Sequence, residues 1–127
     1  MSRSPNQILT KRKVIAHVSV CLGCCCGNTE KGKPAVPDEW LKAEWRARRL
    51  LKNVHLSISG CLGPCDVANA VKINSAEGEI WLGDVQEFYQ YRDLADWASA
   101  CHQAGYVLPL PRDLARLQLE IYRAQGA

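Results

Sequence analysis

The sequence has no long apolar run and no dense block of charge of one sign. Nowhere do its apolar residues approach the roughly 18 in succession that a membrane-spanning helix requires. The apolar stretch nearest the N-terminus, residues 14–22, is interrupted by His17 and lacks the long apolar region of a secretory signal peptide. The net charge is +3, and the densest basic run, residues 11–13, is too short to indicate nucleic-acid binding. We therefore expect a cytoplasmic protein with no membrane span and no nucleic-acid partner.

A dinucleotide-binding fingerprint is also absent, because no G-x-G-x-x-G segment occurs. The sequence therefore gives no reason to expect flavin or nicotinamide chemistry from this chain alone. Its 127 residues suit one domain, and 47% hydrophobic and 23% charged residues are ordinary for a globular protein. We predict a flexible basic arm over residues 1–12, a single domain over residues 13–124 and a frayed tail over residues 125–127.

Cysteine is the residue type that stands out, with seven in the chain. Six of them form two tight groups: Cys21, Cys24, Cys25 and Cys26 in the first, and Cys61 and Cys65 in the second. An odd number of clustered cysteines fits a disulfide framework poorly and a metal site well. In a reducing compartment such thiols stay available as ligands. Cys101 stands alone on an apolar helical stripe, and we expect it in the core.

Hydrophobic periodicity predicts an α/β domain with the order β-α-β-β-β-α-α. Alternation predicts strands over residues 14–20 and 54–58, and a hairpin of strands at 71–73 and 79–82 with its turn at 74–78. Helical spacing predicts helices over 37–53, from about 90 to 105, and from 111 along Leu114, Leu117 and Ile121. The first two strands should be parallel neighbours in a small mixed sheet, with the helices mainly on one face. Polar residues on those strands leave the other face incompletely covered, and a homodimer could form there.

The first predicted helix carries one apolar stripe. Its members are Trp40, Ala43, Ala47, Leu50 and Leu51. Trp45 lies well off this stripe, and we interpret it as a partly buried aromatic residue rather than a docking surface. The basic residues at positions 46, 48, 49 and 52 are typical of a solvated helix face.

Both cysteine groups follow directly after strands that should be parallel neighbours. The C-terminal ends of such strands lie side by side, roughly 5 Å apart per strand step, so the two loops can converge on one small object. Four thiolates can hold either a [2Fe-2S] cluster or a tetrahedral zinc ion. Structural zinc sites usually repeat a C-x₂-C knuckle, whereas the second pair here is C-x₃-C. No histidine lies in either loop, which disfavours a Rieske-type site.

The cysteine spacing resembles that of a known family. Cys21-x₄-Cys26, then 34 residues, then Cys61-x₃-Cys65 is similar to the pattern of the thioredoxin-like [2Fe-2S] ferredoxins, and especially to the thioredoxin-like subunit of respiratory NADH dehydrogenase. The segment C-L-G-P-C-D-V-A-N-A-V at 61–71, followed by a hairpin, strengthens the resemblance, which covers about residues 13–104. It implies a thioredoxin-like fold and one [2Fe-2S] cluster held by Cys21, Cys26, Cys61 and Cys65. It also implies a one-electron carrier rather than an enzyme, with separate donor and acceptor proteins.

The first loop has surplus thiols, which leave alternatives open. Cys24 is the leading substitute for Cys26 as a ligand. A C-x-x-C-C-C-G loop also resembles small ferredoxin-like proteins associated with cobalt chelation for cobalamin synthesis, so a zinc or cobalt binding or delivery module is the alternative function. A thiol–disulfide enzyme using Cys21 and Cys24 is disfavoured, because this C-x-x-C opens a glycine-containing loop rather than a helix.

Overall fold

The computed structural model describes residues 13–23, 25–63 and 65–120, and the predicted arm and frayed tail lie outside them. One five-stranded sheet runs in the order β2-β1-β3-β4-β5. Its strands are β1 (Ala16–Cys21), β2 (Val54–Ser59), β3 (Val71–Ser75), β4 (Gly78–Leu82) and β5 (Gln118–Leu119). The helices are α1 (Asp38–Ala47), α2 (Phe88–Ala104) and α3 (Arg112–Ala115), with 3-10 turns η1 (Thr29–Lys31), η2 (Leu50–Lys52) and η3 (Cys65–Val67).

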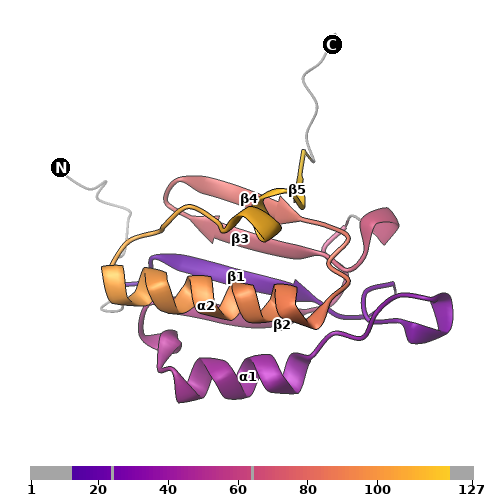
Figure 1. Cartoon of the computed structure of the whole chain (residues 1–127), viewed down its shortest axis with the longest axis horizontal. Helices are drawn as coiled ribbons and strands as arrows, with labels where there is room; N and C mark the ends of the chain where they lie inside the picture. The colour runs from indigo at the N-terminus through magenta and orange to yellow at the C-terminus, as the bar shows by residue number, and fades with distance from the viewer. Residues whose placement is uncertain (1–12, 24, 64, 121–127) are drawn as a thin grey trace, which may run out of the picture.

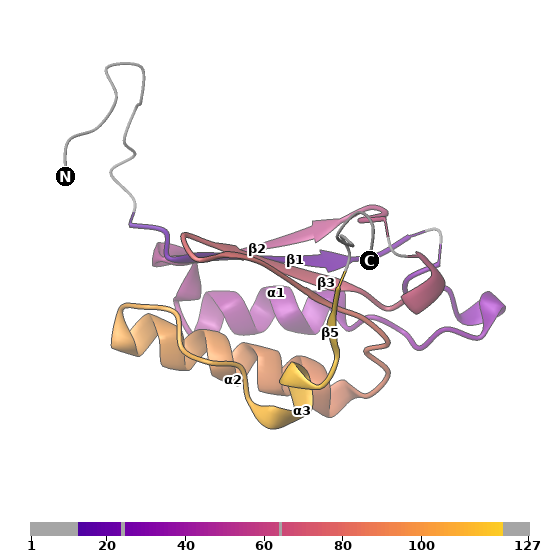
Figure 2. The ribbon, with the colours of Figure 1, turned by 90° about the horizontal axis from the view of Figure 1, so that it is seen from above.

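The sheet is mixed, as predicted. Strand β1 pairs in parallel with β2, while the β1–β3, β3–β4 and β4–β5 pairs are antiparallel. Figure 1 shows α2 in front of the strands with α1 running alongside it, and Figure 2 shows all three helices on one face of the sheet. Asn74 and Ser75 belong to β3, so the hairpin turn is shorter than predicted. None of the described helices combines the length and the hydrophobicity that a membrane span requires.

The core lies between the sheet and the two long helices. Alternate residues of β1 and β3, including Val18 and Ile73, are buried on the helix side. The predicted apolar face of α2 is confirmed, with Leu94 and Cys101 among its buried residues. Gly105 ends α2 in a left-handed conformation with a φ of 83°. Cys101 is therefore a core residue, as expected from the sequence.

The buried face of α1 differs from the prediction. Leu41 and Trp45 face the core, whereas Ala43 and Leu51 are exposed. The helix ends at Ala47, so the residues after it no longer follow the helical spacing on which the predicted stripe depended. Trp45 was wrongly placed off the buried face; it is 1% exposed, and its Nε1 donates a hydrogen bond of 3.0 Å to the Val54 carbonyl.

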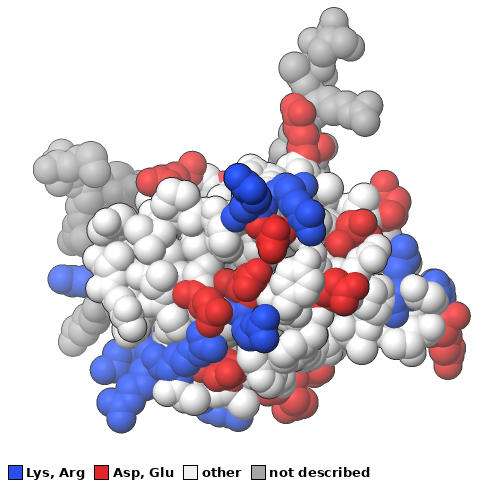
Figure 3. Space-filling view, in the orientation of Figure 1, with Lys and Arg blue, Asp and Glu red and all other residues white. Residues whose placement is uncertain are grey.

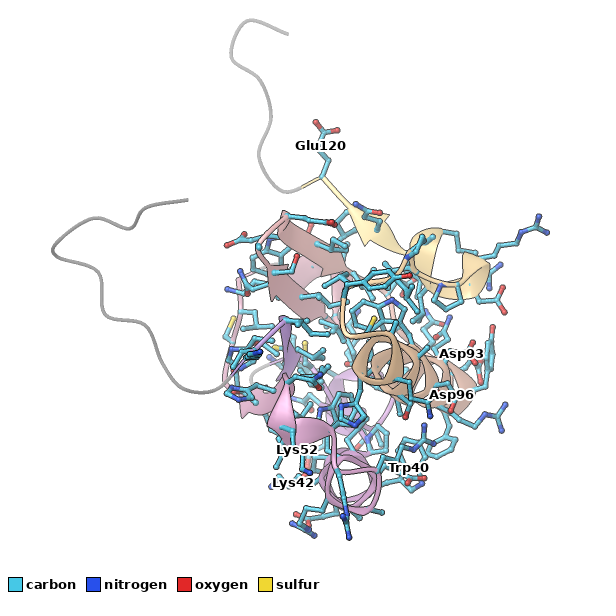
Figure 4. All side chains as sticks on the ribbon, turned by 90° about the vertical axis from the view of Figure 1, so that its left-hand side faces the viewer. Trp40, Lys42, Lys52, Asp93, Asp96 and Glu120 are labelled. Atoms are coloured by element: carbon cyan, nitrogen blue, oxygen red, sulfur yellow. The ribbon has the colours of Figure 1, made fainter. Side chains whose placement is uncertain are left out.

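The contacts of α1 with α2 combine aromatic and charged groups. Trp40 lies between these helices in Figure 4 and packs edge-on against Phe88, with ring centroids 4.7 Å apart. Arg48, predicted on a solvated face, instead reaches α2 and donates to the Asp96 carboxylate at 2.9 Å. Acidic and basic groups are interspersed over this face of the molecule in Figure 3. Helix α1 is therefore attached to α2 along its polar side as well as its apolar side.

The last predicted helix is also shorter than expected. Helix α3 ends at Ala115, and the chain then forms β5 at the edge of the sheet. The Gly83 amide donates to the Leu117 carbonyl at 3.0 Å, and Leu119 pairs with Trp81. The apolar spacing that suggested a long helix is thus divided between one helical turn and an edge strand. Ile121, the last residue of the predicted stripe, lies outside the described residues.

Candidate metal centre

The two cysteine loops begin at neighbouring points of the sheet, as the strand order predicted. Cys21 is the last residue of β1, and it lies opposite Ser59, the last residue of β2. The Leu22 amide donates to the Ser59 carbonyl at 2.8 Å, and the Cys21 amide donates to the Ala70 carbonyl at 3.1 Å. Three chain segments are therefore joined by backbone hydrogen bonds at the place where the cysteines occur.

The first loop folds back on itself and brings Cys26 beside Cys21. The Gly23 amide donates to the Cys26 carbonyl at 3.0 Å. Gly27 has a φ of 71°, which favours glycine, and a Cβ there would lie 2.8 Å from a Leu22 methyl carbon and 3.2 Å from a Val36 methyl carbon. Glycine at this position thus permits both the turn and the close approach of the loop to its own start.

The two loops surround a small hollow that is partly open to solvent. Its lining residues are Cys21, Gly23, Cys25, Cys26, Cys61, Gly63 and Ala70. Cys21 and Cys26 are buried, with 4% and 2% of their surface exposed, whereas Cys61 is exposed at the rim. Three of the four predicted ligands therefore line one hollow. Cys25, which is not among the predicted ligands, lines it as well.

The remaining candidate thiols fall where side chains are not described. Cys65 begins η3, but its side chain is outside the description, and Cys24 lies outside the described residues. Among the side chains that are described, no three from cysteine, histidine, aspartate or glutamate form a group that could hold a metal ion as they stand. The ligand set predicted from the sequence therefore stays a prediction.

The buried thiol of Cys26 has a strongly perturbed acidity. Burial, followed by its hydrogen bond with Cys21, raises the pKa of Cys26 to about 12. The Ala70 amide donates to the Cys26 sulfur at 3.3 Å and opposes this increase by favouring the thiolate. Because metal ions bind the thiolate, a cation in the hollow would have to displace this proton, and the Ala70 amide would stabilise the sulfur once it was charged.

A polar residue that the sequence interpretation missed lies behind the hollow. Asn69 is fully buried; its Oδ1 accepts from the Gly27 amide at 2.8 Å, and its Nδ2 donates to the Pro34 carbonyl at 2.8 Å. The signal was an asparagine between two alanines in the segment that follows Cys65, but a lone asparagine in a loop usually indicates a turn. Here it connects the second cysteine loop to the first.

Tyr91 of α2 is a second buried polar residue near this region. Burial raises the pKa of its hydroxyl well above the usual range, while the Asn69 side chain acts in the opposite direction. The Tyr91 hydroxyl has no well-aligned hydrogen-bond partner among the described residues. The Cys26 and Cys21 thiols also raise this pKa.

The three histidines make their contacts elsewhere. His17 Nε2 and the Ser57 hydroxyl are 2.7 Å apart on the face of the sheet that bears no helices, and His55 lies beside them with its ring edge-on to His17. His102 Nδ1 lies 2.7 Å from the Asn53 side-chain oxygen. The donor atoms of the hollow are therefore sulfur atoms, which suit soft metals and iron–sulfur clusters.

Two solved structures of the thioredoxin-like [2Fe-2S] ferredoxin from Aquifex aeolicus resemble this chain. One superposes with a TM-score of 0.51 over 84% of this chain and 98% of the ferredoxin, at 17% sequence identity. The other has a TM-score of 0.52 over 90% and 98%, at 18% identity. No protein-family model and no curated protein sequence matches the chain. The fold is therefore that of the thioredoxin-like [2Fe-2S] ferredoxins, in agreement with the resemblance in cysteine spacing.

Proposed function

We propose that this chain binds a single [2Fe-2S] cluster through Cys21, Cys26, Cys61 and Cys65 and carries one electron at a time. The observation that carries the proposal is the convergence of thiols from the ends of two parallel strands, β1 and β2, on one hollow. A cluster of this type takes four cysteine ligands. The fold that the chain shares with ferredoxins supports the same function.

The described residues fit such a group chemically. The hollow is lined by sulfur, glycine and alanine, and the Ala70 amide already donates to one of the sulfurs. Amides directed at thiolates lower the free energy of the reduced, more negative state and so influence the reduction potential. The rim position of Cys61 leaves one side of the site at the protein surface, where an electron can pass to another protein.

The residues of the chain bind the cluster and control its surroundings in this function. The bound cluster would supply the one-electron chemistry. The protein would bind it, exclude water around Cys21 and Cys26, and direct the Ala70 amide at the Cys26 sulfur. Because the chain has no flavin or nicotinamide fingerprint, we propose that it is not an enzyme by itself and that it works with separate donor and acceptor proteins in the cytoplasm.

Anaerobic purification tests this function directly. We expect red-brown protein containing about two irons and two sulfides per chain, with a rhombic EPR signal after reduction. The matched control is Cys101→Ser, which changes a buried thiol away from the hollow and should leave metal content and EPR signal unchanged. Colourless protein with one zinc per chain would contradict the proposal, and metal-free protein that reduces disulfides would favour a thiol–disulfide enzyme.

A soft-metal module for zinc or cobalt is the second candidate, and one observation favours it. Cys25 lines the same hollow as the predicted ligands Cys21, Cys26 and Cys61, so the site holds more thiols than one cluster requires if Cys65 also contributes. A delivery protein can use a surplus thiol to pass a metal ion from one ligand set to another. Metal analysis of the purified protein distinguishes the two candidates, because only the first predicts iron together with sulfide.

We also propose a homodimer through the helix-free face of the sheet. Polar side chains of β1 and β2 lie on that face, among them His17, Ser19, His55 and Ser57. Sedimentation velocity should give twice the mass of the 14.1 kDa chain. A sedimentation mass equal to that of one chain, unchanged by protein concentration, would contradict the dimer.

A further inference from the structure

We propose that Asn69 is the positioning residue of this site. Its buried side chain holds the first cysteine loop in the shape that places Cys26 beside the second cysteine loop. That Asn69 matters to a bound cluster rests on the function proposed above. The geometry on which it is based belongs to the protein itself, and it can be tested whatever metal the hollow takes.

The side chain of Asn69 joins two points of the first loop. Its Oδ1 accepts from the amide of Gly27, which is 42 residues away in sequence. Its Nδ2 donates to the carbonyl of Pro34, which is 35 residues away. Since Gly27 directly follows Cys26, the first of these hydrogen bonds fixes the backbone next to a predicted ligand.

The backbone around Asn69 is itself anchored, so the side chain acts from a fixed position. The Val85 amide donates to the Asn69 carbonyl at 3.1 Å, which ties this residue to the segment before α2. The next residue, Ala70, donates its amide to the Cys26 sulfur at 3.3 Å and accepts from the Cys21 amide at 3.1 Å. Asn69 and Ala70 together therefore hold Cys26 from both the backbone side and the sulfur side.

The chemistry requires an amide at this position. The Gly27 amide needs an acceptor, and the Pro34 carbonyl needs a donor, so one side chain must supply both. Asn69→Asp keeps the acceptor but directs a carboxylate oxygen at the Pro34 carbonyl. Asn69→Ala removes both partners and leaves two partly buried backbone groups without these hydrogen bonds.

Asn74 provides a matched control on β3. Its side-chain amide donates to the Glu79 carboxylate at 3.3 Å in an exposed contact, far along the strand from the cysteine loops. Asn74→Ala therefore removes the same chemical group from a place where no cysteine loop depends on it.

Hydrogen exchange of the whole 127-residue chain, as purified without oxygen, tests the proposal. In Asn69→Ala we expect the Gly27 amide to exchange about tenfold or more faster, because losing a buried hydrogen-bond partner lowers the free energy of local opening. The amide of Val18, in the centre of β1, should keep its protection. Asn69→Asp should give a smaller loss at Gly27, since the acceptor remains, and Asn74→Ala should give none.

A spectroscopic readout separates positioning from simple stabilisation. In Asn69→Asp with the cluster bound, we expect altered EPR g values and cluster loss to a chelator about tenfold faster than in the unmodified protein. Unchanged exchange at Gly27, or equal loss of protection at Gly27 and Val18, would overturn the positioning role. If the purified protein held zinc, the proposed electron transfer would fail, while the exchange measurement would still decide the role of Asn69. If Asn69→Ala did not fold, the same comparison would be made on Asn69→Asp.

Discussion

The amide of Ala70 lies 3.3 Å from the sulfur of Cys26, although the two residues are 44 positions apart in sequence. This hydrogen bond joins the segment after the second cysteine pair to the last thiol of the first cysteine group. Cys26 is therefore held from the segment that follows the second cysteine pair as well as from within its own loop. Cys25, by comparison, is only partly buried in the turn that precedes it.

The choice of the fourth ligand can be tested by single serine substitutions. We expect Cys26→Ser to abolish binding of the cluster, because this sulfur is buried beside Cys21 and accepts the Ala70 amide. Cys25→Ser should retain the cluster and serves as the control. Iron and sulfide analysis, together with the visible spectrum, measures both. The opposite pattern, with Cys25 required and Cys26 dispensable, would refute the ligand set, and Cys24→Ser would then show whether Cys24 takes its place.

Gly27→Ala should destabilise the protein more than Gly32→Ala. Both glycines are left-handed, with φ of 71° and 77°, so alanine costs about 1 kcal/mol of conformational free energy at either position. Only at Gly27 would the new Cβ meet Leu22 and Val36, which should add about 1–3 kcal/mol. Urea unfolding of the two variants measures the difference. Equal free energies of unfolding would show that the loop can relax around the new methyl group.

The helix-free face of the sheet should make stability depend on pH. Burial, then the neighbouring His55 and Lys72, lower the pKa of His17 below 6.5. The unfolded chain therefore binds a proton at His17 more readily than the folded protein does. The stability linked to His17 is present above about pH 6.5 and is lost as the pH falls through the lowered pKa.

His17→Gln isolates this contribution from that of the other histidines. We expect the free energy of unfolding of the unmodified protein to fall more between pH 7.5 and pH 5.5 than that of His17→Gln, by about 1 kcal/mol or less for one partly exposed group. Urea unfolding at the two pH values measures this, and NMR titration of the imidazole measures the pKa itself. A His17 pKa at or above 6.5 would contradict the expectation.

Trp45 should contribute more to stability than Trp40. Trp45→Phe removes buried volume and deprives the Val54 carbonyl of the indole donor at 3.0 Å, so we expect a loss of about 2–3 kcal/mol. Trp40→Phe, the control, changes a half-buried ring at the α1–α2 contact and should cost about 1 kcal/mol or less. Guanidinium unfolding compares them. Similar losses in both variants would contradict the burial described for α1.

The strands and the convergence of the cysteine loops could be predicted from the sequence, because alternation fixes which residues face the core and parallel strands end together. The buried face of α1 could not. The left-handed Arg49, with a φ of 56°, ends the helical spacing before Leu50 and Leu51, and nothing in the residue types indicates this. The edge strand that contains Leu119 could not be predicted either, because two residues show too little alternation of polar and apolar side chains to identify a strand.

The role of Asn69 was beyond sequence reasoning for another reason. Its two partners are backbone groups of Gly27 and Pro34 in a distant loop. Every residue has a backbone, so residue types do not indicate which backbone groups a side chain will contact. The prediction of ligands from cysteine spacing identifies the atoms that would bind a metal. It does not identify the residues that hold those atoms in place.

The hydrogen bond between Gly27 and Asn69 also bears on the order of events when the protein is made. A ribosome synthesises Cys21 and the loop after it first, but Asn69 follows Gly27 by 42 residues. The nascent first loop therefore lacks its internal support until β3 has been synthesised and has joined β1. We expect that assembly of the centre follows formation of the sheet, so that the thiols synthesised first are among the last to reach their final positions.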